Sequence, residues 1–168
     1  MSETYAASGN PALREPANQV SPKAPWLWAA GTLIPSVILV AGLVVAERFE
    51  LFDVPAWAWV LLVGSDLAYA VVMPIVRYRV HRWESTETAV YTQTGWLSRE
   101  RRIAPMSRVQ TVDYEQTAVG RLFGLASVTV TTASAAGPLR IQGIAKEVAD
   151  QLVEDLTRRT EAEHGDAT

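Results

Sequence analysis

Cysteine is absent from this 168-residue chain, so disulfides, thiolate nucleophiles and cysteine-ligated metals are excluded. Histidine is scarce as well: His81 and His164 stand far apart, and no zinc-ligand spacing exists. A large excess of one charge is also lacking, because a formal net charge of −3 gives no basis for nucleic-acid binding. The sequence therefore predicts no metal site, no cofactor and no nucleic-acid partner.

The patterns that mark catalytic sites are missing too. The chain has no nucleophile elbow, no glycine-rich phosphate loop before a helix and no telling pair of histidines or carboxylates. Ser107 beside Arg108 is typical of a turn. We therefore expect no catalytic residue, and the protein is not expected to be an enzyme.

What the chain does have is two long apolar runs. Residues 26–46, "WLWAAGTLIPSVILVAGLVVA", contain no charge over 21 positions, enough to cross a bilayer core of roughly 30 Å as a helix. Pro35 inside the run predicts a kink, which membrane helices tolerate. A cleaved signal peptide is the alternative, but this run is longer than an h-region and has no basic n-region beside it.

The second run covers residues 54–76 and follows a connection of only seven residues, "ERFELFD". So short a connection predicts an antiparallel pair of membrane helices. Basic residues are concentrated at the outer flanks of the pair, at Arg14, Lys23, Arg77, Arg79 and Arg82. Because lysine and arginine stay inside, both termini are expected in the cytoplasm, with the protein in the inner membrane of a cell.

After residue 76 the apolar period changes to two, as in β-strands. Six strand-like segments with short connections are present: "RYRVHRW", "TAVYTQ", "ERRIA", "SRVQTVDYEQ", "SVTVTT" and "LRIQGI". They predict an antiparallel sandwich or barrel. In "SVTVTT", Val128 and Val130 are expected to face inward, and in "LRIQGI" the alternation places Leu139 and Ile141 together.

Two helices are expected beside these strands. One apolar stripe at helical spacing runs near the C-terminus, at Ala145, Val148, Ala149, Leu152, Val153 and Leu156, and predicts a helix that completes the core. Residues 117–125 interrupt the alternation and predict about two turns, with Thr117 as N-cap and Gly124 as a left-handed stop. Val119, Leu122 and Phe123 would then face the end of the sandwich, and Arg121 would emerge beside it.

Residues 95–134 are similar to the bacterial pleckstrin-homology-like domain of the YdbS/YdbT type. The matching positions are Gly95 and Trp96, Arg99 to Arg102, Pro105, Ser107 to Gln110, Val112 and Asp113, Arg121 to Ala126, and Val128 to Val130. The resemblance covers about residues 77–160, and two preceding membrane helices are typical of the smaller members. Ala118 departs from the pattern, since a proline is common there.

The resemblance implies a binding or scaffold module rather than a characterised reaction. It also implies, as partner, a larger membrane protein that carries several similar domains. Eukaryotic pleckstrin-homology domains use basic residues near an early strand turn. Here the candidate contacts for lipid or phosphate are Arg77, Arg79, Arg82, Arg99, Arg101 and Arg102; their alternative role is as ordinary positive-inside or solvated residues.

Asp66 is the single charge in the second run, and insertion near the bilayer centre would cost roughly 2.5–3.5 kcal/mol. It either forms a hydrogen bond within the hairpin or pairs with a helix of another subunit. Gly64 and Ala68 form a small-xxx-small motif on the same helix, which favours close approach of a second helix. Gly64, Asp66 and Ala68 are therefore the candidate helix–helix interface of a homo- or hetero-oligomer.

The sequence thus predicts an α+β membrane protein. Its parts are a disordered cytoplasmic tail (1–25), a transmembrane hairpin (26–76, with helices 26–46 and 54–76), a pleckstrin-homology-like domain (77–160) and a disordered tail (161–168). The domain is an antiparallel β-sandwich or barrel capped by a C-terminal helix. The expected function is that of a non-enzymatic scaffold for assembly at the membrane; the alternative is a sensor of anionic lipid headgroups.

Overall fold

The computed structural model describes residues 14–51, 53–133 and 137–165, with side chains as far as residue 162. Its elements in chain order are β1 (Asn18–Gln19), α1 (Ala24–Arg48), α2 (Ala56–Val80), β2 (Arg82–Ser85), β3 (Ala89–Gly95), β4 (Arg99–Pro105), the 3₁₀ turn η1 (Met106–Arg108), β5 (Val109–Glu115), α3 (Ala118–Phe123), β6 (Leu125–Thr132), β7 (Leu139–Ala145) and α4 (Lys146–Gly165).

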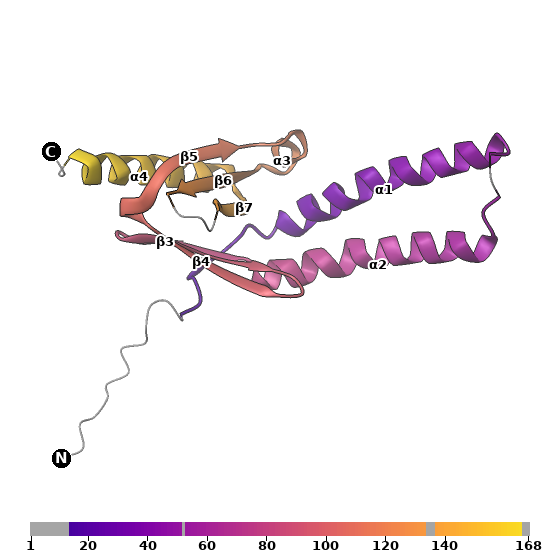
Figure 1. Cartoon of the computed structure of the whole chain (residues 1–168), viewed down its shortest axis with the longest axis horizontal. Helices are drawn as coiled ribbons and strands as arrows, with labels where there is room; N and C mark the ends of the chain where they lie inside the picture. Colours follow the sequence, from indigo (N-terminus) through magenta and orange to yellow (C-terminus); the bar gives the residue numbers. More distant parts are fainter. Residues whose placement is uncertain (1–13, 52, 134–136, 166–168) are drawn as a thin grey trace, which may run out of the picture.

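The helices α1 and α2 form a long hairpin that extends away from the strands (Figure 1). Each has 25 residues, with mean hydropathies of 2.2 and 1.9, so both are long and apolar enough to cross a membrane. Large apolar side chains such as Ile38 and Val60 are exposed along them. So wide an apolar surface fits contact with lipid. The predicted hairpin is confirmed.

The end of α2 differs from the prediction. The helix continues to Val80, and β2 begins only at Arg82, so the strand expected over residues 77–83 is wrong in its first half. The physical reason is that Arg77 and His81 are four residues apart, which places both on the side of α2 that meets α1. Contact with Trp28 of α1 stabilises the helical alternative there.

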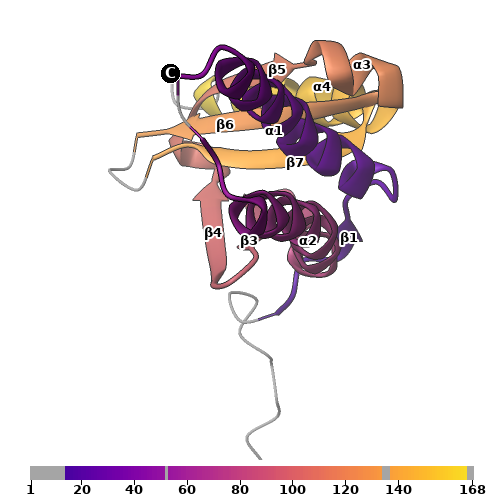
Figure 2. The ribbon, with the colours of Figure 1, turned by 90° about the vertical axis from the view of Figure 1, so that its right-hand side faces the viewer.

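The strands form two antiparallel sheets. Sheet A has the order β1-β2-β3-β4, and sheet B has the order β5-β6-β7. Val128, Val130 and Ile141 are fully buried in the core, as the alternation along β6 and β7 predicts. The predicted antiparallel sandwich is confirmed. In Figure 2, which looks along the hairpin, α1 projects in front of sheet B and α2 in front of sheet A; α1 contacts β7, and α2 contacts β3.

The N-terminal segment is more ordered than the sequence indicates. From residue 14 onward it packs on the domain: β1 pairs with β2, and Val20 and Ala24 belong to the core. The expectation of a disordered tail over residues 1–25 is therefore wrong for 14–25, and residues 1–13 lie outside the described part. A prediction from local sequence patterns misses such a segment, because the residues of β2 with which it pairs are more than 60 positions away in the sequence.

The C-terminal helix α4 covers sheet B, as predicted. Ala149, Leu152 and Leu156 are buried against the strands, and Val148 at the margin of the stripe is half exposed. The helix reaches Gly165, so residues 161–165, expected to be disordered, belong to it. The remaining residues, 166–168, are not described.

The short helix α3 follows the prediction in its ends but not in all of its packing. The Thr117 hydroxyl accepts a hydrogen bond from the Gly120 amide at 3.0 Å, and Gly124 is left-handed with φ 67°. Leu122, however, is 85% exposed. Because α3 packs on α1 and β6, Leu122 is left on the outer side of the helix.

Candidate functional site

Three side chains join the hairpin to the domain. The Arg77 guanidinium lies 4.3 Å from the Trp28 ring centroid and donates a hydrogen bond to the Gln142 amide oxygen at 2.5 Å. The Trp28 ring in turn lies 5.5 Å from the His81 ring. One arginine at the end of α2 therefore contacts both α1 and β7, and fixes how the domain sits on its membrane helices.

The start of α1 packs closely on β7 at a glycine. The amide of Ser21 donates to the Gly143 carbonyl at 2.9 Å, and Gly143 has φ +76°. A Cβ atom at this position would lie 2.7 Å from the Cβ of Ala24 and 3.4 Å from the Trp28 ring. Only glycine combines the left-handed backbone with this close approach.

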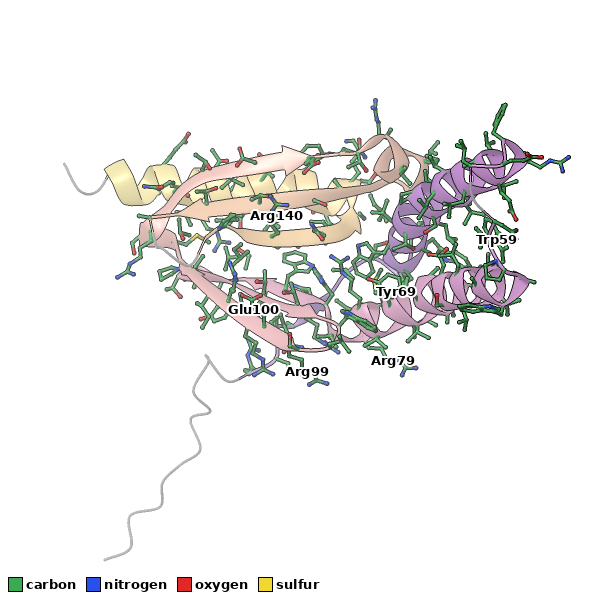
Figure 3. All side chains as sticks on the ribbon, turned by 45° about the vertical axis from the view of Figure 1, so that its right-hand side comes forward. Trp59, Tyr69, Arg79, Arg99, Glu100 and Arg140 are labelled. Carbon is green, nitrogen blue, oxygen red and sulfur yellow. The ribbon has the colours of Figure 1, made fainter. Side chains whose placement is uncertain are left out.

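A cleft of about 400 Å³ opens beside this junction, between the two sheets and α2. Its polar lining comes from α2, β3, β4 and β7, and comprises Arg77, His81, Thr92, Thr94, Glu100, Arg102, Arg140 and Gln142. Figure 3 shows Glu100, Arg140 and Tyr69 on three sides of this region. The cleft is therefore assembled from segments that are distant in the sequence.

Strand alternation explains which arginines reach the cleft. On β4, Glu100 and Arg102 share one face, and Arg99 and Arg101 share the other. Glu100 and the carbonyl of Pro138 hold the Arg102 side chain, at 2.6 and 3.1 Å. Arg140 is exposed and has no acidic partner among the described residues.

The cleft carries a net positive charge. Its lining has three arginines and one glutamate, which gives +2 with His81 neutral. Burial, and then the neighbouring Arg77 guanidinium, lower the pKa of His81 to about 4, so the imidazole is neutral at physiological pH. The Nδ1 atom of His81 is buried and has no hydrogen-bond partner among the described residues.

The cleft also has an apolar side, towards the hairpin. Tyr69 and Met73 of α2 line it together with Trp96, whose ring meets Tyr69 edge-on at 5.7 Å between centroids. A second cavity of about 500 Å³ lies between α1, α3 and sheet B, and also reaches Met73 and Arg77. The site thus combines guanidinium groups with an apolar wall beside the membrane helices, which suits an amphiphilic anion.

The structure divides the six predicted arginines. Arg77 and Arg102 line the cleft. Three others surround the carboxylate of Glu15, each at 3.8 Å: Arg82, Arg99 and Arg101. Arg79 and Arg99 lie on the opposite side of sheet A from Arg140 (Figure 3).

Of the polar residues that line the cleft, sequence reasoning named only Arg77 and Arg102, and it missed His81, Arg140 and Gln142 among others. The usable signal was the alternation of Arg140 and Gln142 with the buried Leu139 and Ile141 along β7. That alternation places both polar side chains on one face of the strand. The alternation does not show, however, which helix or strand lies opposite that face of β7.

The predicted helix–helix residues also divide. The hydroxyl of Ser36 on α1 donates to the Asp66 carboxylate at 2.7 Å, so Asp66 has a partner within the hairpin. Gly64 and Ala68 are exposed on another side of α2, and a Cβ atom at Gly64 would meet nothing within 4 Å. Asp66 is two residues away from both Gly64 and Ala68, and two residues correspond to a rotation of about 200° around a helix. Asp66 therefore points to a different side of α2 from Gly64 and Ala68.

The chain was compared with known proteins. A family model described as bacterial PH domain matches residues 30–160. The chain is also 32% identical over 150 residues to the UPF0699 transmembrane protein YdbS of Bacillus subtilis (strain 168), across 86% of this chain and 92% of that protein. No solved structure matches. The residues matched by the family model include most of the hairpin and every strand except β1.

Proposed function

Because the chain belongs to the bacterial PH domain family and is a membrane protein, we propose that it is a non-enzymatic binding module whose cleft takes up the phosphate of an anionic lipid headgroup. The observation that carries the proposal is the convergence of Arg77, Arg102 and Arg140 on one cleft beside α2. Guanidinium groups bind phosphate through charge-assisted hydrogen bonds, which are stronger than neutral ones. This geometry favours headgroup binding over the scaffold role that the sequence put first.

The orientation belongs to the same proposal. Both termini lie in the cytoplasm, so the cleft faces the inner leaflet, where anionic lipids attract basic segments. Support comes from the basic residues at the domain end of the hairpin, Arg77, Arg79 and Arg82, against Arg48 alone near its tip.

The first test is a titration of the full-length protein in a neutral maltoside detergent. The probes are dihexanoyl-phosphatidylglycerol and, for comparison, dihexanoyl-phosphatidylcholine, with binding followed by calorimetry. We expect the anionic lipid to bind more tightly. Arg140→Gln should weaken that binding by roughly 10- to 150-fold, since a hydrogen bond to a charged group contributes about 1.5–3 kcal/mol.

Arg79→Gln is the control for this titration, because Arg79 is exposed and lies away from the cleft. It should leave the affinity unchanged. Equal affinity for the two lipids, or an equal loss in both variants, contradicts the proposal. Inorganic phosphate in a separate titration distinguishes the ligand source: binding as tight as that of the lipid would assign the cleft to free phosphate instead.

The second candidate function is assembly with another membrane protein, either a second copy or a larger protein with related domains. The exposed small residues Gly64 and Ala68 favour it, because they leave room for the close approach of a helix. Asp66 is turned towards Ser36 and is expected to stabilise the hairpin rather than the complex.

Complex size in a mild detergent tests the assembly. Gly64→Leu should convert a wild-type complex to the monomer, since the larger side chain blocks backbone approach. Asp66→Leu is the control, and should leave the complex intact because Asp66 faces α1. A monomeric wild-type protein, or dissociation by Asp66→Leu alone, rules out this interface.

A further inference from the structure

Two apolar tips of the domain are exposed on the side from which the hairpin emerges. The turn between β3 and β4 carries Trp96 and Leu97, and Leu97 is 84% exposed. The other tip is α3, with Leu122 at 85% exposed. The β3–β4 turn and α3 both reach towards the hairpin in Figure 1, although they belong to different halves of the sandwich.

The position of the first tip along α2 follows from a ring contact. Trp96 meets Tyr69, which is eleven residues, or about 16 Å, before the end of the helix at Val80. A bilayer core needs about 20 helical residues, so counting from Ala56 it ends near Ile75. Tyr69 lies about 9 Å to the lipid side of that boundary, and the β3–β4 turn lies at the same depth.

The second tip is positioned by α1. The cavity beside α3 is lined by Gly31 and Thr32 from α1 and by Val119 and Gly120 from α3. Counting about 20 residues back from Arg48 puts the boundary of the bilayer core near residue 29. The helix α3 therefore stands beside a part of α1 that is about 3 Å or more inside that boundary.

We propose that both tips are inserted in the inner leaflet, so that Leu97 and Leu122 contact acyl chains on either side of the hairpin. The domain is then partly embedded rather than suspended above the bilayer. Exposed arginines flank both tips: Arg99 follows Leu97, and Arg121 precedes Leu122. Such side chains extend back from an apolar anchor to the phosphates.

Lipid is the occupant that fits these positions, because the tips continue the lipid-facing surface of α1 and α2. An amphipathic element at an interface is typically buried by about 5–10 Å, which agrees with the depth of about 9 Å for the first tip. The second tip lies about 3 Å or more inside the same boundary. The insertion does not depend on the headgroup cleft: it rests on Leu97 and Leu122, neither of which lines that cleft.

The natural absence of cysteine allows a direct test. Single variants Leu97→Cys and Leu122→Cys of the full-length protein carry a nitroxide spin label and are reconstituted in vesicles of phosphatidylcholine and phosphatidylglycerol. Collision with oxygen and with a water-soluble nickel chelate then reports depth. Leu39→Cys, exposed in the middle of α1, is the lipid reference, and Glu154→Cys, exposed on α4, is the aqueous reference.

Labels at 97 and 122 should resemble the label at 39, with high oxygen collision and low nickel collision. The label at 97 should report a greater depth than the label at 122, because its tip contacts α2 further inside the bilayer core. Labels that collide with nickel as freely as the one at 154 would overturn the proposal. Labels that collide freely with neither oxygen nor nickel would also overturn it, because the tips would then be covered by protein rather than by lipid.

Discussion

The variant Gly143→Ala is expected to lower the free energy of unfolding by roughly 2–5 kcal/mol, a large fraction of the stability of a domain. Two costs add up. A left-handed backbone costs a residue with a Cβ about 1–2 kcal/mol. Forcing that Cβ to 2.7 Å from Ala24, where the start of α1 docks on β7, adds an overpacking cost of about 1–3 kcal/mol. Thermal unfolding in detergent measures the sum.

Gly137→Ala separates these two costs. Gly137 has the same left-handed backbone, with φ +78°, but its added Cβ would meet only the Arg102 side chain at 3.8 Å. It should therefore lose only the backbone part. In the Gly143→Ala background, Ala24→Gly should restore part of the stability by removing the clashing methyl. Equal losses in the two single variants, without rescue, would mean that α1 does not dock on β7 as described.

The parts of the fold that local pattern specifies could be predicted. The hairpin follows from two uncharged or nearly uncharged runs, and the inward valines of β6 follow from alternation. The ends of α3 follow from a threonine cap and a glycine stop. In each case the deciding contacts lie within a few residues, so sequence spacing contains the information.

The errors occur where a distant partner decides. Four residues after Val76 alternate as a strand would, yet they continue α2, because Arg77 contacts Trp28 and Gln142. Residues 14–25 have no apolar period, yet they pack against β2 and β7. In a short segment, the spacing of apolar residues does not decide between helix and strand, because tertiary contacts can stabilise either one.

The candidate site shows the same division. An arginine cluster was predictable, but its split across β4 needed the register, which sends Arg102 into the cleft and Arg101 towards Glu15. Arg140 was missed because its strand comes 38 residues after Arg102. To predict a cleft between α2, β4 and β7, one must know how the two sheets pack against each other. A single sequence does not give that packing directly.

Acidification should destabilise the docked protein through His81. Its pKa is about 4 in the folded protein and 6.5 in an unfolded chain, because the imidazole is 2% exposed and lies near Arg77. Between these pH values the unfolded chain binds a proton that the folded protein does not. Stability is therefore full above pH 6.5 and falls as the pH approaches 4, by roughly 3 kcal/mol in total.

The variant His81→Phe isolates this effect, since phenylalanine can keep the ring contact with Trp28 without titrating. Every other titratable group is present in both proteins, so its contribution cancels in the comparison. The difference in unfolding temperature between wild type and His81→Phe, measured from pH 7.5 to 4.5, should increase steadily below pH 6.5 in favour of the variant. A difference that stays constant over this range would mean that His81 binds its proton at the same pH in the folded and unfolded protein, so that burial beside Arg77 does not lower its pKa.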